Sequence, residues 1–280
     1  MSKRIAAITT ARNEPVFLPR WIGHYGQALG YENLFVILDG QDQPRPICQG
    51  AERVNFLSLP HIPQGRARGD RRRARTMSDL ARALFRSFDI VMATDADEFL
   101  VVDPALGSGL AAYLSGISGR RSVSGLGLDV AQHLTKEAPI DPTRPLLDQR
   151  QFAIVSARYT KPVVAFRPVT WGAGLHRIKG HNFHIDPNLY LFHFGMVDHQ
   201  IAQQKTSDQE RRKAGWGKHL ERREQVFRTI ADARPVEGDA FFDTARRLET
   251  KKRAFWAWNK PGSLKGPPVV RIPARFRGLV

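Results

Sequence analysis

The sequence has almost no cysteine. Cys48 is the single cysteine among 280 residues, so an intrachain disulfide is excluded, and this usage is typical of a reducing compartment. Paired cysteines and a His-Glu-x-x-His pattern are also absent, which argues against a zinc site. No Walker A loop and no Gly-x-Gly-x-x-Gly fingerprint occurs. The usual nucleotide triphosphatase and dinucleotide-binding folds therefore lose support.

Long apolar runs are missing as well. No segment approaches the length of a transmembrane helix. The run within residues 1–10 is too short for the apolar part of a signal peptide, and Arg12, Asn13 and Glu14 follow it, so we predict a first β-strand there and a cytoplasmic protein. A hydrophobic content of 42% is ordinary for a globular protein, and 280 residues fit one large α/β domain with or without a helical appendage.

Acidic residues are outnumbered. The chain has 43 Lys and Arg against 27 Asp and Glu, a formal net charge of +16. Such a charge predicts attraction to polyanions, whether nucleic acid, an anionic membrane or phosphorylated small molecules. Arginines crowd residues 66–86. We interpret Arg66–Arg75 mainly as a solvated surface, with diphosphate or anionic acceptor binding by a few of these side chains as the alternative.

Strands and helices alternate along the first hundred residues. The apolar periodicity predicts strands over 4–10, 33–39, 54–59 and 90–94, and helices over 15–30 and 70–88. This order implies a largely parallel sheet with helices on both faces. Farther on, we expect strands over 122–130, 161–167 and 189–194, a proline-rich loop over 134–147, and a helical, basic last third in which Phe255 and Trp256 pack in the core.

The most informative segment is an apolar strand that ends in Asp95, Asp97 and Glu98. Side chains two residues apart on a strand point the same way, and two such carboxylates repel each other unless a cation lies between them. Mg²⁺ and Mn²⁺ prefer oxygen ligands and are held by one or two carboxylates plus substrate phosphates. The sequence therefore predicts a metal–diphosphate site, and the competing interpretation is an ordinary acidic turn.

Other polar side chains follow the first two predicted strands. Arg12 and Glu14 come after the first, and Asp39 ends the second. Ligands of open α/β sheets bind at the carboxyl ends of the strands, so these residues should converge with Asp95 and Asp97 on one cleft. Asp39 can contact a base or ribose, although Asp-Gly is also a good turn pair.

Histidines crowd a second region, at His176, His181, His184 and His193. His193 interrupts the apolar run Leu-Phe-His-Phe, where a functional role and a satisfied core histidine are equally supported. For His181 and His184 the structural role is favoured.

The ordered series of Arg-Asn-Glu, strand-terminal Asp and Asp-x-Asp-Glu-Phe-Leu resembles family 2 glycosyltransferases with the GT-A fold. Ile8–Glu14, with Trp21, His24 and Tyr25 on the next helix, is similar to the bacterial branch with a Thr-Asp-x-Asp-Glu-Phe-Leu core. The resemblance covers about the first 105 residues well and 161–205 moderately. It does not extend to the terminal helices.

The resemblance implies roles for individual residues. Arg12 and Glu14 would lie near the nucleotide, Asp39 would contact the base, and Asp95 would touch the ribose or the metal. Asp97 would bind the Mn²⁺ or Mg²⁺ that bridges the diphosphate. A histidine after the last core strand would complete the metal site, and a following lysine would contact phosphate; here these are His193 and Lys205.

The general base is harder to place, because the Glu-Asp motif usual in the family is absent. Asp129, Glu137 and Asp186 are the candidates; Asp129 is preferred, with Asp186 as the alternative. For the whole chain, we expect a GT-A-like catalytic domain over 1–205, divided into a nucleotide-sugar half (1–105) and an acceptor and metal half (106–205). A helical basic extension would follow over 206–280.

These observations predict a metal-dependent, inverting hexosyltransferase. It would move sugar from a nucleotide diphosphate donor to a saccharide or lipid-linked hydroxyl acceptor in surface polysaccharide or glycolipid synthesis. As the alternative to core packing, Phe255, Trp256 and Trp258 beside Lys251–Arg253 would make a peripheral contact with an anionic inner membrane face. The alternatives are a nucleotidyltransferase using the same Asp pair and a basic nucleic-acid-binding protein, although we expect no nucleic-acid partner.

Overall fold

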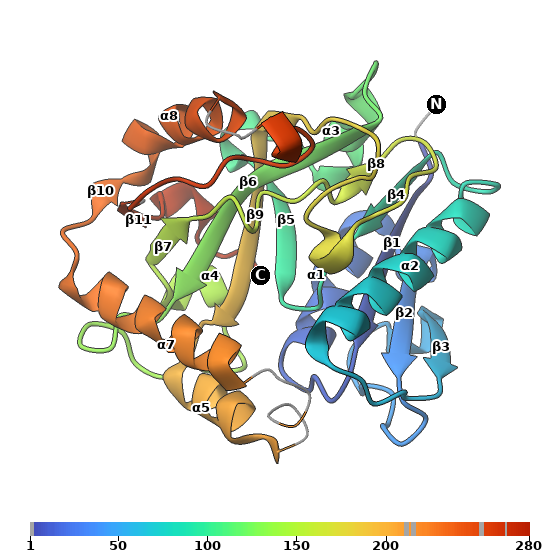
Figure 1. The fold of residues 1–280 in the computed structure, drawn as a ribbon, viewed down its shortest axis with the longest axis horizontal. Helices are drawn as coiled ribbons and strands as arrows, with labels where there is room; N and C mark the ends of the chain where they lie inside the picture. The colour runs from blue at the N-terminus through green and yellow to red at the C-terminus, as the bar shows by residue number, and fades with distance from the viewer. Residues whose placement is uncertain (1–2, 210–212, 214–216, 252–254, 267) are drawn as a thin grey trace.

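A computed structural model describes residues 3–209, 213, 217–251, 255–266 and 268–280 (Figure 1). The described chain forms one mixed sheet with helices on both faces, so the α/β class predicted from the sequence is confirmed. The sheet order is β10-β11-β7-β6-β8-β4-β1-β2-β3, and β9 pairs with both β6 and β5.

The N-terminal half of the sheet is parallel. It contains the four strands predicted there, in the order β4-β1-β2-β3: β1 (Ile5–Ala11), β2 (Leu34–Asp39), β3 (Asn55–Leu59) and β4 (Ile90–Ala93). Side chains along β1 alternate between the faces, with Ile5 and Ala7 in one core cluster and Ile8 in the other. All four strands deliver their carboxyl ends to one edge of the sheet.

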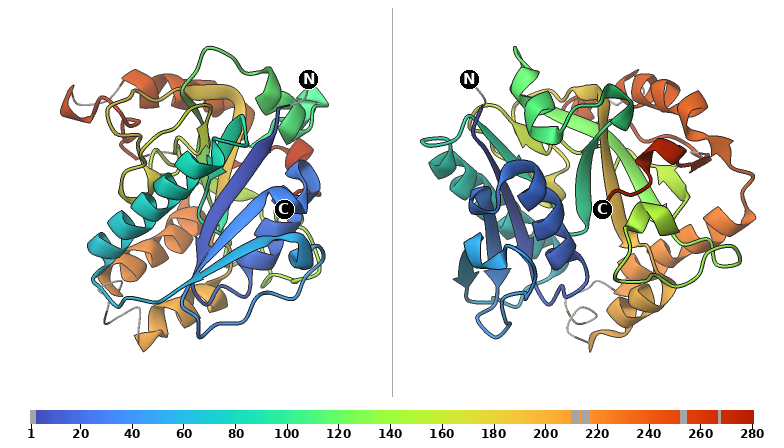
Figure 2. Two further views of the ribbon diagram at one scale, coloured as in Figure 1. Left: turned by 90° about the vertical axis from the view of Figure 1, so that its right-hand side faces the viewer. Right: turned by 180° about the vertical axis from the view of Figure 1, so that it is seen from behind.

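Two helices cover these faces from opposite sides (Figure 2). Phe17, Trp21 and Tyr25 of α1 (Phe17–Leu29) pack on the face that carries Ile5, whereas Met77 and Ala81 of α2 (Arg66–Leu84) pack on the face that carries Ile8. Helix α2 begins at Arg66 rather than at residue 70. The arginine-rich stretch is therefore the first turns of the helix and not a loop that precedes it.

The second half of the sheet is mostly antiparallel. Its strands are β5 (Glu98–Val102), β6 (Ser122–Ala131), β7 (Phe152–Val155), β8 (Val164–Ala165), β9 (Ile185–Met196), β10 (Val236–Glu237) and β11 (Val269–Arg271). β6 and β9 are parallel to each other, and β5 runs antiparallel to β9. The strand expected over 161–167 is limited to the two residues of β8, because Lys161 turns toward the site described below.

The remaining helices surround this second half. They are α3 (Leu110–Gly116), α4 (Leu146–Gln149), α5 (His199–Ser207), α7 (Gly217–Asp232) and α8 (Gly238–Lys251), with short 3₁₀ turns η4 (Ala173–Leu175) and η5 (Phe255–Ala257). The segment expected to be helical after residue 205 is helical over α5, α7 and α8. It also adds β11 to the sheet beside β7. Within the described residues, no helix has the length and apolar character needed to span a membrane.

The prediction that Phe255 and Trp256 pack in the core was wrong. They are 83% and 74% exposed, because they lie in the short 3₁₀ turn η5 rather than on a helix face packed against the sheet. Lys252 and Arg253, which the same prediction included, lie outside the described residues.

Glu249 gives α8 a buried carboxyl group. The residue is fully buried, and neither carboxylate oxygen has a hydrogen-bond partner among the described residues. Burial raises the pKa of Glu249 from 4.5 to about 7, although Thr160 and Arg246 oppose the shift. The folded state therefore disfavours the ionised form of Glu249. The resulting loss of stability is absent below about pH 4.5, where the carboxyl group is protonated in both the folded and the unfolded state, and it is complete above about pH 7.

Glu249→Gln should consequently be more stable than the wild type by on the order of 2 kcal/mol at about pH 8, and equally stable at about pH 4. Urea unfolding at both pH values measures this difference. Glu237→Gln, at a carboxylate that is 71% exposed, is the matched control and should change neither value. An equal effect of Glu249→Gln at both pH values would contradict the account.

Candidate functional site

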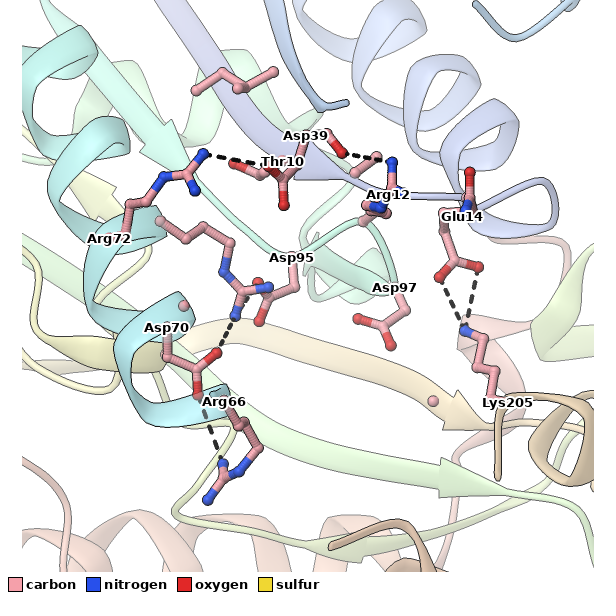
Figure 3. Close-up of a pocket in the computed structure, with 18 of the residues that line it drawn as sticks. Thr10, Arg12, Glu14, Asp39, Arg66, Asp70, Arg72, Asp95, Asp97 and Lys205 are labelled. Carbon is pink, nitrogen blue, oxygen red and sulfur yellow. Dashed lines mark hydrogen bonds and ion pairs between the residues drawn. The ribbon is translucent and has the colours of Figure 1, made fainter. Parts of the chain in front are cut away.

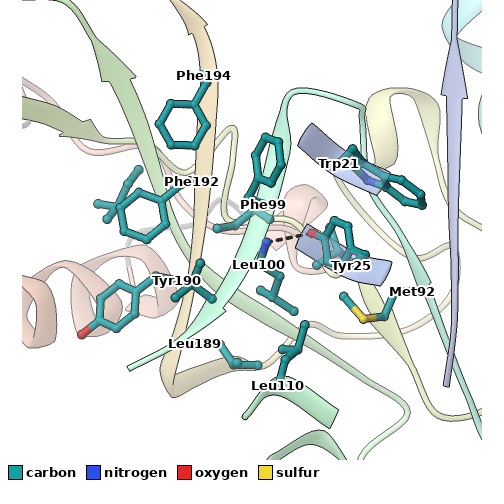
Figure 4. Packing of buried hydrophobic residues seen from close by; sticks show 14 of the residues in the cluster. Trp21, Tyr25, Met92, Phe99, Leu100, Leu110, Leu189, Tyr190, Phe192 and Phe194 are labelled. Carbon is teal, nitrogen blue, oxygen red and sulfur yellow. Dashed lines mark hydrogen bonds between the residues drawn. The ribbon is translucent and has the colours of Figure 1, made fainter. Parts of the chain in front are cut away.

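Helix α1 fixes the turn between β4 and β5 that carries the Asp-x-Asp sequence. Trp21 Nε1 donates to Thr94 Oγ1 at 2.8 Å. Tyr25 Oη accepts from Leu100 N at 2.8 Å (Figure 4). Tyr25 Oη also donates to the Glu98 carbonyl at 3.2 Å, so the beginning of β5 is held from one side. These aromatic residues, which the sequence resemblance singled out, thus support the turn from within the core.

A cleft of about 1040 Å³ opens at the carboxyl edge of the parallel strands. Figure 3 shows side chains from β1, β2, α2, the β4–β5 turn and α5 around it. Seven residues predicted from the sequence line this one cleft: Arg12, Glu14, Asp39, Asp95, Asp97, His193 and Lys205. The predicted convergence of these residues is therefore present in the structure.

Asp95 is held by cations. Lys161 Nζ lies 2.8 Å from Asp95 Oδ2 and 2.5 Å from Glu98 Oε1, and Arg73 Nη2 lies 3.6 Å from Asp95 Oδ1. Burial alone would raise the pKa of Asp95, but Lys161 and Arg73 outweigh it and lower the pKa to about 2. Asp95 is therefore ionised at neutral pH, and both its oxygens already face a positive charge.

Asp97 faces a histidine instead. Its Oδ2 lies 3.5 Å from His193 Nε2, while His193 Nδ1 lies 2.8 Å from Asp129 Oδ1. Burial would raise the pKa of Asp97, but His193, Lys205 and Arg223 lower it far below its ordinary value. Burial would likewise lower the pKa of His193, yet Asp97 and Asp129 raise it.

Two further side chains fix the His193 ring. Tyr159 stacks on it with a centroid distance of 3.8 Å and an interplanar angle of 13°. Arg223 of α7 donates to Asp129 at 2.9 Å and also bonds to the Tyr159 hydroxyl. Because the Asp129 carboxylate accepts from Nδ1, the Nε2 atom of His193 is the one directed at Asp97.

The chemistry of this pair suits a divalent cation. In the part of the chain that the structure describes, no three His, Cys, Asp or Glu side chains are grouped to hold a metal by themselves. Asp97 and His193 nevertheless supply two donors, and Mg²⁺ or Mn²⁺ commonly takes its remaining ligands from substrate phosphates. A carboxylate behind the ligating histidine, as Asp129 is here, is the usual support for such a ligand.

Gly195 keeps the space between these two donors open. A Cβ atom there would lie 2.6 Å from His193 Cε1, 2.9 Å from His193 Nε2 and 3.2 Å from Asp97 Oδ2. The ring cannot easily move away, because Tyr159 and Asp129 hold it. The donor pair therefore lies in a cradle that any side chain at residue 195 would fill.

Gly195→Ala should accordingly weaken metal-dependent diphosphate binding by at least about tenfold while destabilising the fold by roughly 1–3 kcal/mol. Calorimetric titration and urea unfolding measure the two effects. Gly23→Ala is the matched control, because its Cβ meets nothing within 4 Å, and it should leave binding unchanged. Unchanged binding by Gly195→Ala would show that the cradle holds no ligand.

The opposite wall of the cleft carries the residues expected near a nucleotide. Arg12 Nη1 donates to the Asp39 carbonyl at 3.1 Å and to Asp42 at 2.7 Å. The Asp39 carboxylate lies 3.2 Å from His61 Nδ1 and 3.4 Å from Arg72 Nη2. Glu14 bonds to Lys205 Nζ at 3.0 Å, which links β1 to α5 across the cleft.

The arginine-rich helix divides between the cleft and the solvent. Arg66, Arg72 and Arg73 line the cleft, whereas Arg68 and Arg71 are exposed outside it. Asp70 lies between Arg66 and Arg73 and also lines the cleft (Figure 3). The sequence interpretation of a solvated surface therefore holds for only part of this segment.

The two preferred base candidates lie outside the cleft lining. Asp129 is behind His193, and its carboxylate is bonded to both His193 and Arg223. Asp186 is the second residue of β9, where its carboxylate accepts from Tyr113 Oη at 2.8 Å and from Asn188 N at 2.9 Å. Neither residue is part of the cleft lining.

Glu137, the third carboxylate considered, also lies outside the cleft lining. It accepts from the backbone N–H groups of His133 and Gln151, both at 2.7 Å, and so organises a loop. His181 and His184 are likewise outside the lining, whereas His176 is part of it.

Sequence reasoning missed Lys161, Tyr159 and Arg223. The position of Lys161 directly before the apolar run 162–166 could have indicated it, because a lysine buried with such a run needs a carboxylate partner. Arg223 lies in a basic helix and has no local feature that distinguishes it from neighbouring arginines.

No family model matches the sequence, and no curated protein matches it. Among solved structures, the chain is similar to a mannosyltransferase from Pyrobaculum calidifontis in complex with GDP-Man and Mn²⁺. The identity is 16% and the TM-score 0.40, over 90% of this chain and 82% of that one. It is also similar to a Bacillus anthracis protein described as a glucose-1-phosphate thymidylyltransferase, in complex with a sucrose. There the identity is 11% and the TM-score 0.28, over 75% and 78% of the two chains. Neither likeness is close enough to assign an activity.

Proposed function

We propose that this protein is a metal-dependent glycosyltransferase of family 2, which transfers a hexose from a nucleotide diphosphate donor to a hydroxyl of a saccharide or lipid-linked acceptor. The observation that carries the proposal is the Asp97–His193 pair, directed into a cleft at the carboxyl edge of a parallel sheet and flanked by Arg66, Lys205 and Arg223. Carboxylate, imidazole and guanidinium groups together suit a metal-bound diphosphate.

The two ends of the cleft would bind different parts of the donor. Asp39, beside His61 and Arg72, would accept hydrogen bonds from the base or ribose. Arg12 and Glu14 would border the nucleotide, and Lys205 would move from Glu14 to a phosphate oxygen. Asp95, held by Lys161, would be a rigid acceptor for a ribose or sugar hydroxyl rather than a primary metal ligand.

Asp97 and His193 would hold Mn²⁺ or Mg²⁺. When bound, the ion would act as a Lewis acid that stabilises the charge on the departing nucleoside diphosphate. Asp129 orients the imidazole, Tyr159 covers one of its faces, and Arg223 neutralises Asp129. The protein would thus present two fixed donors and would not need to rearrange them as charge develops.

The general base for an inverting transfer must face the acceptor side of the cleft. Asp70 lines the cleft, whereas Asp129 and Asp186 do not, and burial raises its pKa although Arg73 and Arg66 contact its two oxygens and oppose the shift. A raised pKa makes a carboxylate a better proton acceptor. We therefore propose Asp70 as the base.

The cleft supports this function better than nucleic-acid binding. Most of its cations are paired with carboxylates, as Lys161 is with Asp95 and Lys205 with Glu14, so they do not form an open positive surface for a polyanion. A nucleotidyltransferase would use the same Asp pair, and the reaction products distinguish it.

A panel of nucleotide sugars tests the proposal. With Mn²⁺ present, at least one donor should release nucleoside diphosphate slowly into water, and chelation should stop the release. Release of pyrophosphate from a nucleoside triphosphate and sugar phosphate would indicate the nucleotidyltransferase instead. No release and no binding by any donor would contradict both functions.

A further inference from the structure

Three large aromatic side chains are exposed next to one another in sequence. Phe255, Trp256 and Trp258 are 83%, 74% and 44% exposed, whereas Trp21 and Trp171 are buried. Phe255 and Trp256 stand edge to face with a centroid distance of 4.9 Å. Exposed aromatic residues in a group mark an interaction surface more often than isolated ones do.

The sequence around these aromatic residues has one sign of charge. After Glu249 there is no Asp or Glu up to the last residue, and there are eight Lys or Arg. Glu249 itself is fully buried, and of the eight cations Arg271 and Arg275 are paired with Glu237, Asp103 and Asp239 from elsewhere in the chain. In the sequence, Lys251 precedes the aromatic group and Lys265 follows it, and both are exposed. Lys260 is partly exposed.

The aromatic segment is anchored next to the cleft. Asn259 Nδ2 donates to the Ile178 carbonyl at 3.1 Å, which ties the segment to the loop that follows η4. Gly174 of η4 and the adjacent His176 line the cleft.

We propose that Phe255, Trp256 and Trp258, with Lys251, Lys260 and Lys265, form a docking surface for an anionic lipid bilayer. Aromatic rings are favoured at the boundary between headgroups and acyl chains, and lysines around them gain from anionic headgroups. A protein or nucleic-acid partner would use the charge but would not need three exposed rings on a short turn. The docking surface does not depend on the proposed transferase function, because no cleft residue belongs to it.

Vesicle flotation of the full chain, without nucleotide or acceptor, tests the proposal. The protein should float with vesicles of phosphatidylcholine and phosphatidylserine and remain unbound with phosphatidylcholine alone. Phe255→Ser with Trp256→Ser should lower the partition coefficient by at least about tenfold. Lys251→Gln should lower it by about fivefold at low salt.

Ile47→Ser is the matched control, because Ile47 is an apolar side chain with 102% relative exposure in a loop after β2, and it should float like the wild type. Thermal unfolding should be the same for all variants, since each replaced side chain is exposed. Equal flotation of the double variant and the wild type would overturn the proposal. Flotation that does not depend on phosphatidylserine would also overturn it, as would binding to an oligonucleotide that outcompetes the vesicles.

Discussion

Asp97→Asn should lower donor turnover by at least about a hundredfold while leaving the protein folded. Asparagine keeps the shape of the side chain but loses the negative charge that faces His193 Nε2 at 3.5 Å. The two donors directed into the cleft would then be two neutral groups, which are poor ligands for a hard divalent cation. Release of nucleoside diphosphate from the best donor of the panel measures the loss.

The neighbouring carboxylate provides the sharpest comparison. Asp95→Asn should reduce turnover less and destabilise the fold more, because Asp95 is paired with Lys161 and Arg73. Asp79→Asn, at an exposed carboxylate on α2, is the neutral control. If Asp95→Asn and Asp97→Asn behaved alike in turnover and in stability, the different roles assigned to these two residues would be wrong.

Lys161→Met should have the largest effect on stability. Lys161 is 2% exposed and lies between Asp95 and Glu98, and Glu98 is fully buried. Removing the cation leaves two carboxylates without their main partner, and breaking a buried ion pair from one side costs about 3–5 kcal/mol. Urea unfolding at neutral pH measures the loss.

The pH dependence of the stability of Lys161→Met tests whether the unpaired carboxylates cause its destabilisation. Burial raises the pKa of Glu98 even with Lys161 in place, so its carboxyl group should take up a proton readily once the lysine is gone. The destabilisation should therefore shrink as the pH falls. The double variant Lys161→Met with Glu98→Gln should recover part of the stability lost in Lys161→Met. Lys179→Met, at an exposed lysine, is the control and should change the free energy of unfolding little. A loss below about 1 kcal/mol would contradict the assigned pairing.

The parallel half of the fold could be predicted from the sequence because its signals are local. β1, β2, β3 and β4 are short apolar runs separated by helical spacing, and each begins and ends within a residue or two of its predicted position. The convergence of Arg12, Asp39 and Asp97 followed from a general property of parallel sheets, whose carboxyl ends share one edge.

The environment of each carboxylate could not be predicted in the same way. Lys161 is 66 residues from Asp95, and Arg223 is 94 residues from Asp129, and no local pattern connects the partners. Asp129 was the preferred base near the end of the strand predicted over 122–130, but its partners depended on where His193 and α7 lie. The exposed positions of Phe255 and Trp256 depended on a 3₁₀ turn, η5, which the sequence does not distinguish from a helix.

The central claim is that Asp97 and His193 bind a divalent cation together with a nucleoside diphosphate. Calorimetric titration of the wild-type protein with UDP and GDP, with and without Mn²⁺, tests it most directly. At least one diphosphate should bind at least about tenfold more tightly when Mn²⁺ is present. Binding that is equally tight without the ion, or no binding of either diphosphate, would contradict the claim.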